Sequence, residues 1–205
     1  MEKIYWQHVE CLVLLSKKIN SILNYINFNN GSNKPKQRLP SAFKDSKKAL
    51  SAMQRLCSMR EYCRYDINIK LKKLELSDNE RKQIIISLEE DKFLDNSRYA
   101  VAFVRDKAAF NGWGTTKIRW ALKLKKVEEE IIEEAMKQLP PEDELQRLSL
   151  LLNKKIKSLN REQEKAKVRV KLIRFAISRG FDYDKVIPVV NKIMANFVKD
   201  KPDFN

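Results

Sequence analysis

The chain of 205 residues is 43% hydrophobic and carries 42 Lys and Arg against 27 Asp and Glu, which gives a formal net charge of +15. Such a charge favours polyanionic or acidic partners, nucleic acid among them. Three cysteines and one histidine exclude a structural zinc site of the usual spacing, and an odd cysteine count argues against a secreted disulfide framework.

Long stretches of the chain contain no helix breaker. Only four glycines and six prolines occur among abundant Lys, Glu, Leu and Ile, so we expect an all-α protein. The longest apolar run near the start, Cys11–Leu15, is too short for a signal-peptide core or a membrane span. We therefore expect a cytoplasmic protein that does not bind a membrane.

Residues 1–43 form a predicted N-terminal extension. Its apolar residues recur every three or four positions, which predicts one face of an amphipathic helix. These residues are Leu12, Leu15, Ile19, Ile22 and Ile26. The stretch Asn27–Pro40, rich in Asn, Gly, Pro and Lys, predicts a linker. The helix either packs on another surface, pairs with a copy of itself, or belongs to a dispensable extension.

An internal repeat of about 50 residues begins near Ser46. The first unit, 44–94, is predicted to have three helices, the third opened by a capping box from Ser77 to Glu80. An offset of 51 residues aligns its apolar positions with those of a second unit at 95–140: Met53 with Val104, Ile67 with Ile118, Leu71 with Leu122, Leu76 with Val127, Ile84 with Ala135 and Leu88 with Leu139.

A third unit at 141–198 follows the second at an offset of 54 residues. The aligned pairs are Ile118 with Leu172, Leu122 with Ala176, Val127 with Phe181, Met136 with Val190 and Leu139 with Ile193. Its first helix is predicted around Leu145–Leu159, and a tail remains at 199–205. The predicted fold is thus all-α, a tandem array of three-helix, helix-turn-helix-like repeats that bury their apolar stripes against themselves and their neighbours.

The central unit has the most ordered pattern. Asp95, Asn96 or Ser97 is expected to cap a helix with one apolar face. That face comprises Tyr99, Ala100, Phe103, Val104 and Phe110. Gly112 and Gly114 permit positive φ on both sides of Trp113 and predict a tight turn. A second helix then begins at Thr115 or Thr116, with Ile118, Ala121 and Leu122 inside and Lys117, Arg119, Trp120 and Lys123 outside.

Two groups of basic residues are candidate contacts with a partner or with nucleic acid, because cationic side chains hold phosphates and Trp can stack on bases. The central group is Arg98, Arg105, Lys107, Lys117, Arg119, Trp120 and Lys123, and the second group is Lys167, Arg169, Lys171, Arg174 and Arg179. The alternative is an ordinary solvated face, with Trp113 and Trp120 packed in the core.

Catalytic patterns are lacking in the sequence. No glycine-rich phosphate loop, Ser/His/Asp set or paired carboxylates stand out, and His8, the one histidine, lies in the extension. We expect no enzymatic activity, no metal and no cofactor.

At these central residues the chain resembles the RecX family. The resemblance is carried by Phe93-Leu94-Asp95, Arg98-Tyr99-Ala100, Ala102-Phe103-Val104-Arg105, Lys107, Gly112-Trp113-Gly114, Lys117-Ile118-Arg119, Ala121-Leu122 and Val127. It extends more weakly over about residues 46–197. Two positions depart from the family pattern, which usually has Pro at the place of Thr115 and Gly at the place of Lys126.

The resemblance implies an elongated, curved array of repeats that binds the RecA recombinase. It implies a negative regulator that lies on the RecA filament on single-stranded DNA and inhibits ATP hydrolysis, strand exchange and coprotease activity. A monomer is expected. The alternative, from a different class, is a basic helical protein that binds bare DNA directly and whose affinity falls steeply with salt.

Overall fold

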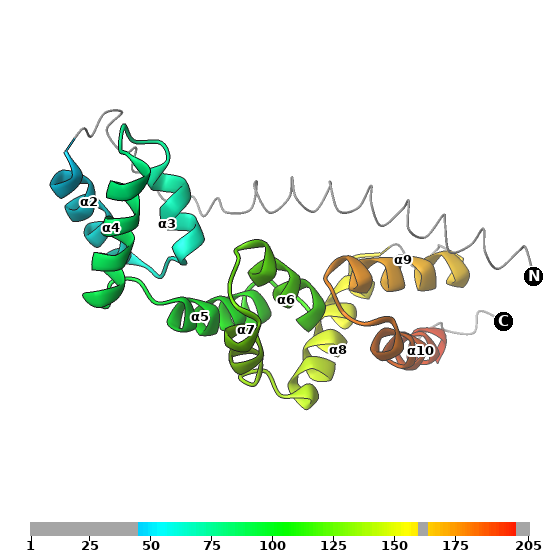
Figure 1. Cartoon of the computed structure of the whole chain (residues 1–205). Coiled ribbons are helices and arrows are strands. Elements are labelled where there is room, and N and C mark those ends of the chain that lie inside the picture. Colours follow the sequence, from blue (N-terminus) through cyan, green and yellow to red (C-terminus); the bar gives the residue numbers. More distant parts are fainter. Residues whose placement is uncertain (1–44, 160–163, 200–205) are drawn as a thin grey trace, which may run out of the picture. The chain divides into compact units, whose positions relative to one another are not determined.

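The computed structural model describes residues 45–159 and 164–199 (Figure 1). Within these ranges the chain forms nine α-helices and no strand, which confirms the all-α prediction. The helices are α2 (Ser46–Met59), α3 (Arg64–Leu71), α4 (Asp78–Glu90), α5 (Asn96–Ala109), α6 (Thr115–Leu124), α7 (Glu129–Met136), α8 (Pro141–Lys157), α9 (Lys165–Ser178) and α10 (Tyr183–Lys199). The helix and linker predicted before residue 44, and the tail after residue 199, lie outside the described residues.

The helices pack in consecutive groups of three, as expected for tandem repeats (Figure 1). In the first group α4 packs on α2 and α3, in the second α5, α6 and α7 pack on one another, and in the third α8, α9 and α10 do so. We call these groups repeats 1, 2 and 3. None of the described helices is long and apolar enough to cross a membrane.

The aligned apolar positions form the cores of the repeats. Met53 and Ile67 of repeat 1 are fully buried, and so are Val104 and Ile118, the residues 51 positions later. Leu172, which aligns with Ile118, is fully buried in repeat 3. Because removal of aliphatic side chains from water is the main favourable contribution to folding, a shared burial pattern leads to the same three-helix unit three times.

Several helix ends follow the predicted local chemistry. Ser77 and Glu80 form the capping box at α4, and the Asp95 carboxylate accepts hydrogen bonds from the first turn of α5. Gly180, just after α9, has φ of +85° and is the left-handed residue expected there. Lys126 adopts the same left-handed region, with φ of 55°, after α6.

Three expectations for the helix ends were wrong. Phe110 is 85% exposed, because α5 ends at Ala109 and the apolar periodicity of the helix does not extend past its last turn. Gly114 has φ of −78° and is the N-cap of α6, so only Gly112, with φ of 60°, uses the positive region. The first helix of repeat 3 begins at Pro141, four residues before the predicted Leu145, since Pro is well suited to the first helical position.

Candidate partner-binding surface

The Gly-Trp-Gly turn of repeat 2 packs against the end of α9 in repeat 3. The backbone N–H of Gly114 donates to the carbonyl oxygen of Arg179 at 2.9 Å. A Cβ on Gly114 would lie 2.2 Å from the carbonyl oxygen of Gly180, closer than any side chain can approach. Glycine is therefore required at 114 for the close approach of two backbones rather than for a positive φ.

Lys117 belongs to this junction and does not point to solvent. The side chain was predicted on the outside of α6, but the residue is only 9% exposed. Its Nζ donates to the carbonyl oxygen of Ser178 at 3.1 Å and lies 4.7 Å from the centre of the Trp113 ring. Burial, and then the nearby positive charge of Arg179, lower the pKa of Lys117. The prediction for Lys117 was wrong because α9, which covers it, is more than 40 residues away in the sequence.

Two further predicted residues lie near this turn. Lys107 of α5 places Nζ 5.2 Å from the Trp113 ring centre, and burial lowers its pKa. Arg179 donates to the carbonyl oxygen of Asn111 at 2.7 Å. The structure thus brings Lys117 of the central group together with Arg179 of the second group at the junction of repeats 2 and 3, while Lys107 packs on Trp113 within repeat 2. Trp113 is buried, which confirms the packing alternative for this residue.

Glu144 is a part of the junction that the sequence analysis missed. It is only 1% exposed, and its Oε1 accepts hydrogen bonds from the N–H and the hydroxyl of Thr115 at 2.9 and 2.7 Å. Its Oε2 accepts from Nζ of Lys185 at 2.6 Å. Burial alone would raise the pKa of Glu144, but the hydrogen bonds from Lys185 and Thr115 outweigh it and hold the pKa below its usual value. The one feature of the sequence that could have indicated this contact is Thr115, which stands where the family pattern described above usually has Pro.

Arg98 joins repeat 2 to repeat 1. Its Nε donates to Oε1 of Glu61 at 2.6 Å, and a terminal nitrogen donates to the carbonyl oxygen of Lys92 at 3.2 Å. The hydrogen bond with Glu61 raises the pKa of Arg98. Arg105, further along α5, is exposed and donates to Gln138 at 3.2 Å.

The other cations of α6 are paired with carboxylates of α7. Arg119 forms an ion pair with Glu133 and approaches Glu129 at 3.6 Å, while Lys123 contacts Glu129 at 2.9 Å. Trp120, on the same helix, is half-buried. Because the acidic first turn of α7 lies beside α6, the positive charge of the middle helix of repeat 2 is largely neutralised.

The middle helix of repeat 3 has a different electrostatic character. α9 contains five Lys and Arg and no acidic residue. Lys167, Lys171 and Arg174 are exposed and are spaced three or four residues apart, so they share one face. Lys167 contacts Glu164 at 3.1 Å, and Arg169 donates to Asn191 at 3.2 Å. We call the exposed Lys167, Lys171 and Arg174 the α9 face; Arg169, two positions from Lys167, lies on another side of the helix. It is the most cationic surface among the predicted site residues.

No group of His, Cys, Asp and Glu side chains within the described residues could hold a metal ion.

The predicted site residues fall into groups according to what they contact. Arg98, Lys117 and Arg179 form contacts between repeats, and Lys107 packs on Trp113 within repeat 2. Arg105 and the α9 face are directed to solvent.

Models of protein families match repeats 2 and 3. RecX, second three-helix domain, matches residues 95–136, and RecX, third three-helix domain, matches residues 142–190. The chain is 38% identical over 106 residues to regulatory protein RecX of Clostridium botulinum (strain Eklund 17B / Type B), covering 51% of this chain and 49% of that protein. It is 30% identical over 152 residues to regulatory protein RecX of Prosthecochloris aestuarii, covering 74% of this chain and 97% of that protein.

Two solved structures share the fold. A crystal structure of regulatory protein RecX has a TM-score of 0.62 and 24% identity, with 74% of this chain and 71% of that chain covered. The crystal structure of RecX from Lactobacillus salivarius has a TM-score of 0.63 and 19% identity, with 72% and 96% covered. The chain spans about half the length of the C. botulinum relatives that it matches.

Proposed function

The chain belongs to the RecX family of regulatory proteins, and on that premise we propose that it is a negative regulator of the RecA recombinase. It binds RecA, or the RecA filament on single-stranded DNA, and inhibits ATP hydrolysis, strand exchange and coprotease activity. It acts by binding, without catalysis or a cofactor of its own, in the cytoplasm. The observation that carries this proposal is the match over both repeat 2 and repeat 3.

The α9 face is the proposed contact with the filament. Three cations on one face of α9, a helix that contains no acidic residue, suit a surface that presents phosphate and carboxylate groups together. Arg105 and the partly exposed Arg119, Trp120 and Lys123 of repeat 2 extend the proposed contact. Arg98, Lys117 and Arg179 act indirectly in this proposal, since their contacts hold neighbouring repeats against one another, and Lys107 acts by packing on Trp113.

ATP hydrolysis by RecA on single-stranded DNA, measured while the protein is titrated in, tests the proposal. We expect inhibition, and we expect the double variant Lys167→Glu/Arg174→Glu to need roughly tenfold more protein for the same effect, because like charges then face the filament. The matched control is Lys47→Glu/Lys48→Glu, which changes the net charge equally on exposed positions of α2. No inhibition by the unaltered protein, or equal weakening by both double variants, would refute the proposal.

A second candidate function is direct binding of bare nucleic acid. The unbroken positive charge of α9 favours it, because Lys and Arg that neutralise phosphates release counterions. Binding of single-stranded DNA without RecA, measured at several salt concentrations, separates the two functions. Tight, steeply salt-dependent binding without inhibition of RecA would select this second function, and inhibition without such binding would select the first.

A further inference from the structure

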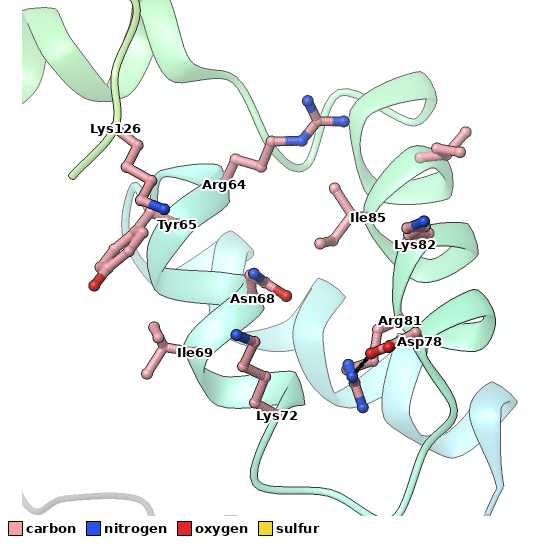
Figure 2. A pocket seen from close by; sticks show the side chains of 11 residues that line it. Arg64, Tyr65, Asn68, Ile69, Lys72, Asp78, Arg81, Lys82, Ile85 and Lys126 are labelled. Atoms are coloured by element: carbon pink, nitrogen blue, oxygen red, sulfur yellow. Dashed lines mark ion pairs between the residues drawn. The ribbon is translucent and has the colours of Figure 1, made fainter.

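A groove in repeat 1 lies apart from every contact described above. It has a volume of about 680 Å³ and is lined by α3 on one side and α4 on the other, as Figure 2 shows. Lys126, from the connection between α6 and α7, lies beside Tyr65 at one end. Its volume is in the range of sites that hold small molecules or short peptide segments. We call it the α3–α4 groove.

Aliphatic side chains line part of this groove. Ile69 of α3 and Ile86 of α4 are 38% and 40% exposed, although the neighbouring Ile67 and Ile85 are buried in the core. Each exposed isoleucine is thus off the core face of its helix and lines the outer part of the groove. Scattered exposed apolar residues are ordinary, but two that line one groove, with Tyr65 beside Ile69, mark an apolar contact surface.

The rim of the groove is positively charged. Five cationic side chains line it against one carboxylate, Asp78. Arg64 is paired with Glu89 at 3.0 Å, and Arg81 is paired with Asp78. The remaining three cations are Lys72, Lys82 and Lys126. Lys72 and Lys82 are exposed and form no ion pair within residues 45–159 and 164–199, so they are available to a negatively charged ligand.

Lys126 is held at the groove in a costly backbone conformation. Its φ of 55° lies in the left-handed region, which side chains other than glycine adopt at an energetic cost. In that conformation its Nζ lies 5.9 Å from the centre of the Tyr65 ring. This conformation ends α6, where the N–H of Val127 donates to the carbonyl oxygen of Leu122 at 3.2 Å, and it sets the direction of the Lys126 side chain.

We propose that the α3–α4 groove binds an acidic peptide segment that also carries aliphatic or aromatic side chains. Its carboxylates contact Lys72, Lys82 and Lys126, and its apolar side chains pack on Ile69 and Ile86. A nucleic acid could contact the three lysines and stack a base on Tyr65, but it would leave both isoleucines in water. A peptide of this kind contacts both the lysines and the isoleucines of the groove. This binding does not require RecA.

Fluorescence anisotropy with defined probes tests the proposal on the full chain. The probe is a fluorescein-labelled short peptide of Glu and Asp with interspersed Leu and Phe, and its matched partner has Ser in place of Leu and Phe. The groove variants are Ile86→Asp and Lys82→Glu, both at exposed positions. The control variants are Met59→Asp and Lys47→Glu, which make the same chemical changes at exposed positions of α2 that do not line the groove. Circular dichroism verifies that all four variants keep their helical content.

We expect saturable binding of the Leu/Phe peptide that each groove variant weakens roughly tenfold or more, while the control variants bind like the unaltered protein. The Ser peptide is expected to bind much more weakly. Failure of the Leu/Phe peptide to bind, equal binding of the Ser peptide, or equal losses in groove and control variants would each overturn the proposal. Unlabelled oligothymidylate that displaces the peptide, and that itself loses affinity in Lys82→Glu but not in Ile86→Asp, would assign the groove to nucleic acid instead.

Discussion

Removal of the Glu144 carboxylate should loosen the junction between repeats 2 and 3. The variant Glu144→Ala deletes two charge-assisted hydrogen bonds to Thr115 and one to Lys185. Charge-assisted hydrogen bonds contribute roughly 1.5–3 kcal/mol each. Two effects reduce the loss below their sum: the partly exposed Lys185 can be solvated instead, and the variant no longer has to bury a carboxylate. We therefore expect the free energy of unfolding to fall by about 3 kcal/mol.

Urea unfolding followed by circular dichroism measures this loss. With a denaturant slope of roughly 1–3 kcal/mol/M, the midpoint should fall by roughly 1–3 M. Glu142→Ala is the matched control, because Glu142 lies in the same first turn of α8 but is exposed, and it should change stability by less than about 0.5 kcal/mol. Equal losses for the two variants would refute the assignment of Glu144 to the junction.

The residue at position 115 gives a second arm to the same experiment. Thr115→Pro removes both donors to Glu144 although Pro suits the first position of a helix, and we expect a loss of about 1–2 kcal/mol. In the Glu144→Ala background the same change should cost nearly nothing, because the acceptor is already absent. A cost that is the same in both backgrounds would show that Thr115 and Glu144 do not interact.

The contribution of Glu144 to the free energy of unfolding should depend on pH with a definite sign. The folded-state pKa of Glu144 is lowered, so its contribution to stability is fully present above the unfolded pKa, roughly 4.3, and is lost as the pH falls through the lower folded value. The difference in unfolding free energy between the unaltered protein and Glu144→Ala should thus be constant above about pH 6 and shrink in acid. A difference that grows on acidification would contradict this.

Three further predictions concern single positions. Gly114→Ala should lower the free energy of unfolding by about 3 kcal/mol, since its Cβ would collide with the Gly180 backbone, and an unchanged urea midpoint would contradict this. Lys126→Gly should raise the free energy of unfolding by about 0.5–1 kcal/mol, because glycine adopts a left-handed φ without strain. The urea midpoint should therefore rise, and a lower midpoint would be evidence against strain at Lys126. Burial raises the pKa of Cys57 to about 11 and of Cys63 to about 12. Iodoacetamide near pH 8 should therefore alkylate neither thiol, as judged by mass spectrometry, unless urea is added. Alkylation of either thiol in the native protein would refute the burial argument.

The repeated helical unit could be predicted from local patterns in the sequence. Leu71 and Leu122 are buried 51 residues apart, and Ser77 and Asp95 cap the helices predicted for them. These features are local, since the spacing of apolar residues within a helix and a cap within one turn are both visible in a short window of sequence. The family resemblance rested on the same local pattern in repeat 2, and it was confirmed.

The contacts of each cation, in contrast, depend on how the helices pack. Lys117 and Arg119 are two residues apart and looked equivalent, yet Lys117 is buried against α9 and Arg119 is paired with Glu133. Glu144 gave no sign of its burial, because its partner Thr115 lies 29 residues away. A charged side chain has the same local sequence signature whether it faces water or a neighbouring helix. Whether such a side chain is buried or exposed depends on long-range packing, because burial is tolerated only where a distant partner satisfies its hydrogen bonds.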